Sequence, residues 1–237
     1  MVARVGLIIP SSNRMVEQEM VRFFPEDVVP HITRLRMTGA NRKSIGDLLP
    51  DVEAAAAALA DAKCDVIVFH CTANSMSEGF DGEARLLETI KKAGAPHMAT
   101  TSTAIMEALR ALQATSVSLV TPYDEKVTAH EVHFLEERGL HVPYAKGWAL
   151  GGSDAYCATP SETWRERMME TKASGAQATF LSCANVRGIA IVEAVEKQLG
   201  VPMITSNQAV IFESLRQLGW QGSKRPPGQV FDTLRSS

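Results

Sequence analysis

The stretch Val66-Ile-Val-Phe-His-Cys-Thr-Ala-Asn-Ser75 predicts both the class of fold and the place of the chemistry. Its first four residues form a short apolar run, which is typical of a buried strand in a parallel sheet. The run ends at Cys71, and small and polar residues follow. Ligands of α/β proteins bind beyond the carboxyl ends of the strands, where backbone N–H groups can receive anions. A thiol at this position is therefore well placed to react.

The chain repeats this arrangement in its second part. Thr179-Phe-Leu-Ser-Cys-Ala-Asn185 is another apolar run that ends in a cysteine, Cys183. The spacing between Cys71 and Cys183 equals the spacing between Pro10 and Pro122, each of which marks the end of an earlier apolar run. We therefore expect two related halves, each with one thiol at the end of a strand.

The alternation of strands and helices predicts an α/β fold of two halves, each with a parallel sheet covered by helices on both faces, and a cleft between the strand ends where the halves face each other. The expected halves are residues 1–114 and 115–220, and their boundary depends on whether they exchange helices. The tail 221–237 lacks a helical period, so we expect a packed extension or partial disorder. Strands are expected at 4–9, 31–37, 66–69, 97–100, 116–121, 141–149, near 179–183 and at 203–205. Helices are expected at 15–24, 51–62, 82–93, 102–112, 124–138, 160–174, 188–199 and 207–218, with loops at 39–44 and 150–159.

Composition narrows the class of protein. The 237 residues are 45% apolar and 22% charged, which suits a chain with a substantial core, and the net charge of −3 argues against nonspecific binding to nucleic acid. No apolar run is long enough to cross a membrane, and no signal segment is apparent at the N-terminus. Four cysteines without close spacing indicate reduced thiols. We therefore expect a cytoplasmic protein, which we also expect to form a homodimer or homotetramer.

Matched thiols on opposite walls of a cleft suit two kinds of chemistry. One thiol can remove a proton from carbon while the other returns it to the opposite face, or one thiolate can add to a carbon–carbon double bond while the other handles a proton. Either route gives an enediolate, which needs hydrogen-bond donors where its charge develops. Ser11, Ser12, Asn13, Thr72, Ser75 and Tyr123 lie at predicted strand ends and are candidate donors, although each is equally suited to capping or turn formation. Cys64 and Cys157 are expected to be small core residues.

Other functional motifs are weak. The sequence contains no glycine-rich dinucleotide or P-loop motif, so no nucleotide cofactor is expected, and it contains no Gly-x-Ser-x-Gly elbow. His130 and His133 could share a metal, but a solvated helix face is the better interpretation, and we expect no metal site. His70 is expected to point away from Cys71 because side chains alternate along a strand.

Four motifs resemble the aspartate/glutamate racemase superfamily, in particular the branch of maleate cis–trans isomerase and arylmalonate decarboxylase. They are Val5-Gly-Leu-Ile-Ile-Pro-Ser-Ser-Asn13, the strand ending in Cys71, Thr121-Pro-Tyr123 and Leu181-Ser-Cys183. The resemblance implies an α/β fold of two pseudo-symmetric, Rossmann-like domains with the active site at their interface. It also implies a cofactor-free enzyme in which Cys71 is the nucleophile and Cys183 the proton donor or acceptor. It implies that Asn13 and Tyr123 bind a substrate carboxylate. Ser11, Thr72, Ala73 and Ala184 complete the expected substrate-binding set.

The decarboxylases of this branch have glycine in place of the first cysteine, so two thiols favour an isomerase or racemase. Two departures argue against maleate itself: Ala155 replaces a substrate-binding Asn, and the polar residues 72–75 resemble those of amino-acid racemases. The leading expectation is a cofactor-independent isomerase of a small dicarboxylic acid, with the loop 151–159 closing over the ligand. The alternatives are racemisation or decarboxylation of a 2-substituted acid, and a non-enzymatic carboxylate sensor.

Overall fold

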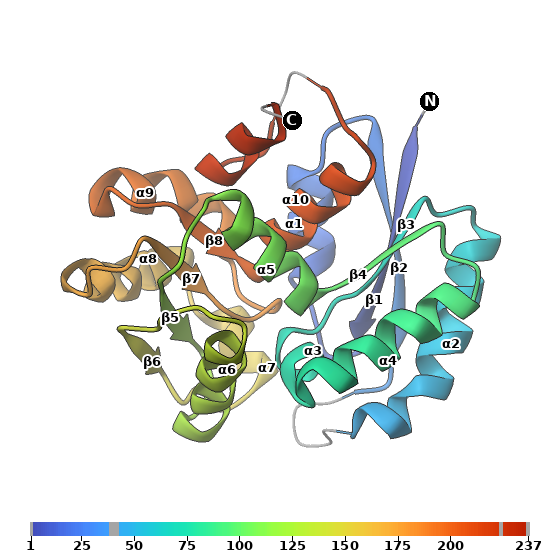
Figure 1. Ribbon diagram of the computed structural model, residues 1–237, viewed down its shortest axis with the longest axis horizontal. Coiled ribbons are helices and arrows are strands. Elements are labelled where there is room, and N and C mark those ends of the chain that lie inside the picture. Colours follow the sequence, from blue (N-terminus) through green and yellow to red (C-terminus); the bar gives the residue numbers. More distant parts are fainter. Residues whose placement is uncertain (1, 38–42, 223–224, 236–237) are drawn as a thin grey trace.

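Two four-stranded parallel sheets form the framework of the protein in a computed structural model, which describes residues 2–37, 43–222 and 225–235 (Figure 1). The first sheet has the order β2 (Val28–Leu35), β1 (Ala3–Pro10), β3 (Val66–Phe69), β4 (His97–Thr100). The second has the equivalent order β6 (Ala145–Gly147), β5 (Val117–Thr121), β7 (Ala178–Leu181), β8 (Met203–Thr205). The expected pair of parallel α/β halves is confirmed.

The helices follow the strands in alternation, as the apolar patterns predict. In the first half they are α1 (Val16–Phe23), α2 (Ile45–Asp61), α3 (Thr72–Met76), α4 (Gly79–Lys92) and α5 (Thr101–Ala111). In the second half they are α6 (Glu125–Glu137), α7 (Ser153–Ala158), α8 (Ser161–Met169), α9 (Val192–Leu199) and α10 (Ser206–Gln217), with short 3-10 turns η1 (Glu170–Ala173), η2 (Ile189–Ile191) and η3 (Gln229–Arg235). Among the described residues, no helix is long and apolar enough to span a bilayer.

Strand register places the two cysteines at equivalent points. Ile8 of β1 pairs with Phe69 of β3, and Val120 of β5 pairs with Leu181 of β7. Each cysteine lies two residues beyond the end of its strand, next to the turn that follows the neighbouring central strand. The central strands β3, β5 and β7 are buried throughout, which explains their uninterrupted apolar sequences.

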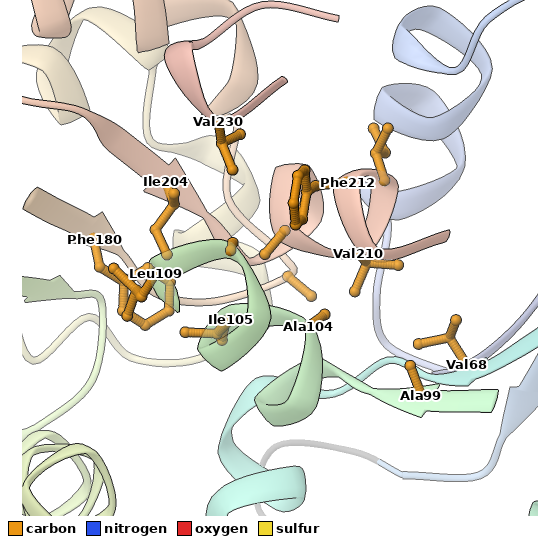
Figure 2. Close-up of a cluster of buried hydrophobic side chains, with 14 of the residues drawn as sticks. Val68, Ala99, Ala104, Ile105, Leu109, Phe180, Ile204, Val210, Phe212 and Val230 are labelled. Atoms are coloured by element: carbon orange, nitrogen blue, oxygen red, sulfur yellow. The ribbon is translucent and has the colours of Figure 1, made fainter. Parts of the chain in front are cut away.

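The helices α5 and α10 lie between the two sheets and contact each other (Figure 1). Ile105 and Leu109 of α5 lie near Phe180 of the second sheet (Figure 2). Val210 of α10 lies near Val68 of the first sheet in the same core (Figure 2). The last helix of each half therefore packs against the sheet of the other, and the two halves share a hydrophobic core.

Several boundaries differ from expectation for identifiable reasons. Helix α2 begins before Pro50 because the Ser44 hydroxyl accepts the Asp47 N–H at 3.1 Å and caps it. Short helices occur at α3 and α7, where the sequence predicted turns and a loop. The tail folds back as η3, whose Val230 and Phe231 are buried. Most of the loop expected at 39–44 lies outside the described residues.

Candidate active site

Both cysteines line one cavity of about 880 Å³ between the two halves. The cavity is also lined by Asn13, Thr72, Ala73, Tyr123 and Ala184, which are all candidate substrate-binding residues. Cys71 is half-buried and Cys183 is buried. Cys71 is close enough to Cys183 and Tyr123 to contribute to the pKa of each. The geometry therefore brings the two strand-end thiols to a shared space.

Cys183 has an unusual backbone conformation. Its φ of 102° lies in a region that non-glycine residues rarely adopt, and such strain is often found at functional sites. Two contacts hold the residue: its N–H donates to Ser206 Oγ at 3.1 Å, and the Asn185 N–H donates to Cys183 Sγ at 3.3 Å. Burial raises the pKa of Cys183 to about 12, although the hydrogen bonds to its sulfur oppose this shift. The side chain is therefore a thiol near neutral pH.

Tyr123 lies beside Cys183 on the second wall of the cavity. Burial, followed by the neighbouring Cys183, raises the pKa of the phenol well above its usual value, and the phenol forms a hydrogen bond with the thiol. The Tyr156 ring of α7 meets Tyr123 edge-on, with ring centroids 5.8 Å apart. Tyr123 is thus a protonated hydrogen-bond donor in a fixed position.

Cys71 directly precedes α3, which begins at Thr72. The N–H groups in the first turn of a helix have no partner within it, so those of Thr72 and Ala73 are suited to an anionic ligand. The Thr72 hydroxyl instead donates to Ser206 Oγ at 2.9 Å. The Cys71 thiol lies 3.7 Å from Asn74 Oδ1, and Asn74 also lines the cavity. Thr72 and Ala73 can therefore act through their backbone.

Asn13 lines the cavity, and its amide is bonded within the protein. Its Oδ1 accepts from the N–H groups of Met15 and Val16 at 3.0 Å, which forms a turn directly before α1, and its Nδ2 donates to Ala184 O at 3.0 Å. The second hydrogen of Nδ2 is the part of this side chain available to a ligand. The turn-forming role of Asn13, which the sequence left open, is present in the structure.

The structure does not bring Ser11 to the cavity. Ser11 is exposed, and its hydroxyl bonds to Met37 O at 3.2 Å. The neighbouring Ser12 does line the cavity and accepts a hydrogen bond from Ser153 at 3.2 Å. This contact joins the turn after β1 to the start of α7.

The segment from Leu150 to Tyr156 forms another wall of the cavity. Gly152, with φ of 113°, provides the turn into α7, and Asp154 forms an ion pair with Arg14 of the first half. Part of the predicted closing loop is therefore a short helix already joined to the opposite half. Further lining residues come from α6 and from positions flanking the motifs, where no local pattern marks them as part of a site. They are Asn74, Ser77, Asp124, Lys126, Val127, His130 and Asn185.

The remaining cysteines differ from each other. Cys64 is buried in the core, as expected, and burial raises its pKa to about 11. Cys157 is half-buried on α7, and its thiol donates to Asn185 Oδ1 at 3.0 Å. Cys157 therefore supports a residue that lines the cavity, which the expectation of a simple core position did not include.

The histidines occupy structural or exposed positions. His70 is buried and bonds to Thr101 and Asn207. His130 and His133 are both exposed on α6; His130 bonds to Ser77 O at 3.1 Å, and His133 pairs with Glu137. Within residues 2–37, 43–222 and 225–235, no group of three or more His, Cys, Asp or Glu side chains is arranged to hold a metal.

Two α/β halves with an interdomain cavity and one strand-end thiol from each define the class of this protein. The family model of arylmalonate decarboxylase matches residues 5–231, and the chain belongs to that family. The resemblance inferred from the four motifs is therefore confirmed.

Individual relatives fall within the same group. Maleate isomerase from Nocardia farcinica is 27% identical over 227 residues, which cover 92% of this chain and 90% of the relative. A structure of Nocardia farcinica maleate cis–trans isomerase bound to TRIS has a TM-score of 0.90 at 24% identity, with both chains covered completely. A Cys-to-Ser mutant of that enzyme, with a covalently bound succinylcysteine intermediate, has a TM-score of 0.88 at 25% identity, again over the whole of both chains.

Proposed function

We propose that this protein is a cofactor-independent cis–trans isomerase of a small dicarboxylate, with maleate as the first candidate substrate. The observation that carries the proposal is the pair of thiols, Cys71 and Cys183, on one cavity between the halves. Relatives named maleate isomerase match more than nine-tenths of the chain, which supports this reaction over others of the family. The succinylcysteine intermediate of one such enzyme supports covalent chemistry at a cysteine.

In the proposed reaction, the Cys71 thiolate adds to one alkene carbon and forms a C–S bond. The electron pair of the double bond moves to the neighbouring carbon and its carboxylate as an enediolate. Cys183 donates its proton to that carbon, and the resulting C–C single bond can rotate. Removal of a proton by the Cys183 thiolate then expels Cys71 and restores the double bond. Both thiols return to their starting states, so no cofactor or redox partner is consumed.

The environment of Cys183 supports its role as the proton donor. Its pKa of about 12 keeps the thiol protonated until a carbanion forms beside it. Tyr123 and the backbone N–H groups of Thr72, Ala73 and Ala184 are proposed to bind the carboxylates, and Asn13 adds one amide hydrogen. Such donors stabilise the enediolate most strongly where water is excluded.

The test is direct. Purified protein incubated with maleate should form fumarate, which NMR in deuterated water detects together with any deuterium uptake. Deuterium exchange at an α-carbon without alkene chemistry would favour a racemase, and release of carbon dioxide from a malonate would favour a decarboxylase. Ligand-induced stabilisation without turnover would favour a sensor.

A cytoplasmic location and a homodimeric or homotetrameric state stay predictions.

A further inference from the structure

A buried polar chain joins the turns that carry the two cysteines. Asn207, in the first turn of α10, lies between His70, which precedes Cys71, and Ala184, which follows Cys183. Asn207 Oδ1 is 2.8 Å from His70 Nε2, and Asn207 Nδ2 is 3.3 Å from Ala184 O. A single amide, only 1% exposed, thus contacts both cysteine-bearing turns.

Glu19 of α1 fixes the orientation of this amide. Asn207 Nδ2 also donates to Glu19 Oε2 at 2.5 Å, so two acceptors face Nδ2 and Oδ1 must face His70. His70 Nε2 therefore carries a hydrogen. Burial lowers the pKa of His70 to about 4, so the ring is neutral and its Nδ1 accepts from the Thr101 hydroxyl at 2.9 Å. Each polar atom of the Asn207 amide has a defined partner.

The same carboxylate holds the segment that follows Cys183. Glu19 Oε1 accepts from the N–H groups of Gly188 and Ile189 at 3.0 and 3.1 Å. Glu19 belongs to α1, whose first residue, Val16, donates its N–H to Asn13 Oδ1, and Asn13 also donates to Ala184 O. These hydrogen bonds tie α1 and the end of β3 in one half to α10 and the segment after β7 in the other.

We infer that Asn207, oriented by Glu19, is a positioning residue that sets the placement of Cys71 relative to Cys183. This inference rests on the proposed function, in which both sulfurs must reach one substrate. The two cysteines extend from different sheets, so neither half alone fixes their separation. The α5–α10 core between the sheets is apolar and nondirectional, whereas the bonds of Asn207 are directional and end one residue from each cysteine.

The substitution Asn207→Asp tests this role with almost no change in shape. One oxygen of the new carboxylate still accepts from His70, but the other replaces a donor and faces Glu19 and the Ala184 carbonyl. We expect kcat to fall by roughly 100-fold, the loss that a displacement of about 1 Å in a catalytic group can cause. KM should rise as well, because the N–H groups of Thr72, Ala73 and Ala184 that are proposed to bind the carboxylates lie on the same two turns. A folded N207D variant that keeps the wild-type kcat would overturn the inference.

A reciprocal exchange provides the rescue. In the double variant E19Q/N207D, the new amide at position 19 can donate to the new carboxylate at position 207 while its oxygen still accepts from Gly188 and Ile189. We expect kcat to recover by about tenfold relative to N207D. In N207D alone, a proton shared by the two carboxylates relieves their repulsion, so kcat should fall further as pH rises. Loss of packing alone would give neither the rescue nor this change in pH profile.

Glu196→Gln is the matched control. Glu196 is as buried as Glu19, at 7% exposure, and its Oε1 likewise accepts two backbone N–H groups, those of Met203 and Gln229. These partners lie away from the cysteine-bearing turns, so E196Q should keep the wild-type kcat. If N207D does not fold, Asn207→Ser removes the same contacts without adding a charge and is judged by the same kcat criterion.

Labelling with iodoacetamide separates this inference from the proposed reaction. Peptide mass spectrometry can follow alkylation of Cys71 and Cys183 without any substrate. We expect N207D to change the labelling rate of Cys183 relative to Cys71 several-fold, and E19Q/N207D to return it toward the wild-type ratio. If the wild type converts no dicarboxylate, the proposed function fails, but an altered ratio still supports the positioning role. An unchanged ratio in folded N207D would overturn it.

Discussion

The Thr72 hydroxyl, one residue after Cys71, donates a 2.9 Å hydrogen bond to the hydroxyl of Ser206 in the other half of the chain. Ser206 Oγ also accepts from the Cys183 N–H at 3.1 Å. Ser206 is fully buried at the start of α10, directly before Asn207. The first turn of α10 therefore contacts the Cys183 backbone and the Thr72 side chain, which directly follows Cys71.

Replacing Ser206 by Ala should reduce stability and turnover together. The change leaves the Cys183 N–H and the Thr72 hydroxyl without their acceptor, and a buried unsatisfied group costs about 1–3 kcal/mol. Urea denaturation measures the free energy of unfolding, and the maleate assay measures kcat. Ser214→Ala is the control on the same helix, because the Ser214 hydroxyl only donates to Val210 O one turn earlier. Equal effects of the two substitutions would contradict a special role for Ser206.

Replacing Cys71 by Ser should lower kcat by more than about a thousandfold without unfolding the protein, because serine is a much weaker nucleophile at neutral pH. Cys71 is half-buried, so the change leaves the core intact. The control substitution is Cys64→Ala. Cys64 lies in the core of the first half, so its replacement should cost on the order of 1 kcal/mol of stability while turnover is preserved. Near-normal conversion of maleate by C71S would exclude Cys71 as the nucleophile.

Replacing Cys183 by Ser should trap the substrate on the enzyme. In C183S, Cys71 can still add to the alkene and a proton from water can replace the one from the second thiol, but a serine hydroxyl is a poor group for the later proton removal that expels Cys71. Intact-mass measurement after incubation with maleate should show the mass of one substrate added, and peptide mapping should place it on Cys71. Full turnover by C183S, or an unmodified Cys71 in the folded variant, would contradict the assigned roles.

The buried Glu19 should make stability depend on pH in a predictable direction. Burial raises its pKa to about 7, although hydrogen bonds from Asn207, Ile189 and Gly188 and the charge of Arg187 oppose the shift. The folded state therefore holds a proton that the unfolded chain releases near its ordinary value of 4.5. As the pH rises from 4.5 to about 7, the carboxyl group of Glu19 loses its proton freely in the unfolded chain but not in the folded protein. The contribution of Glu19 to stability therefore falls over this range, by at most about 3 kcal/mol.

Urea denaturation of wild type and E19Q at acidic and alkaline pH checks this prediction. The stability of wild type relative to E19Q should fall as pH rises. Glu83 provides the contrast: burial raises its pKa, but hydrogen bonds from Ser102, Arg138, Thr100 and Thr103 outweigh burial and lower it overall. The same comparison with E83Q should therefore show the opposite slope. Parallel pH curves for wild type and E19Q would contradict the raised pKa of Glu19.

Local patterns were sufficient for the elements whose sequence matches their burial. The apolar runs of β3 and β7 are buried along their length, and the strand β4 has the predicted limits. The helix α7 was missed because its six residues are too few to show a helical period, and none of them is buried. Its contacts with the other half, through Asp154 and Ser153, connect positions far apart in the sequence.

The candidate site was predicted where a residue lies one or two positions beyond the end of a strand. Cys71, Cys183 and Tyr123 are such residues, and all three line the cavity. Ser11 has the same kind of position but is exposed. The contributions of Lys126 and His130 depend on how α6 is placed, which no local pattern specifies.

The sequence by itself determined the two parallel α/β halves and the location of one thiol at the end of a strand in each. Those features follow from apolar patterning and from a repeated motif, which are properties of neighbouring residues. Only the tertiary structure decided which residues join the halves: Glu19, His70 and Asn207 look like ordinary polar residues until folding buries them together. The physical reason is that buried polar groups must find hydrogen-bond partners, and the partners available here come from segments more than a hundred residues apart.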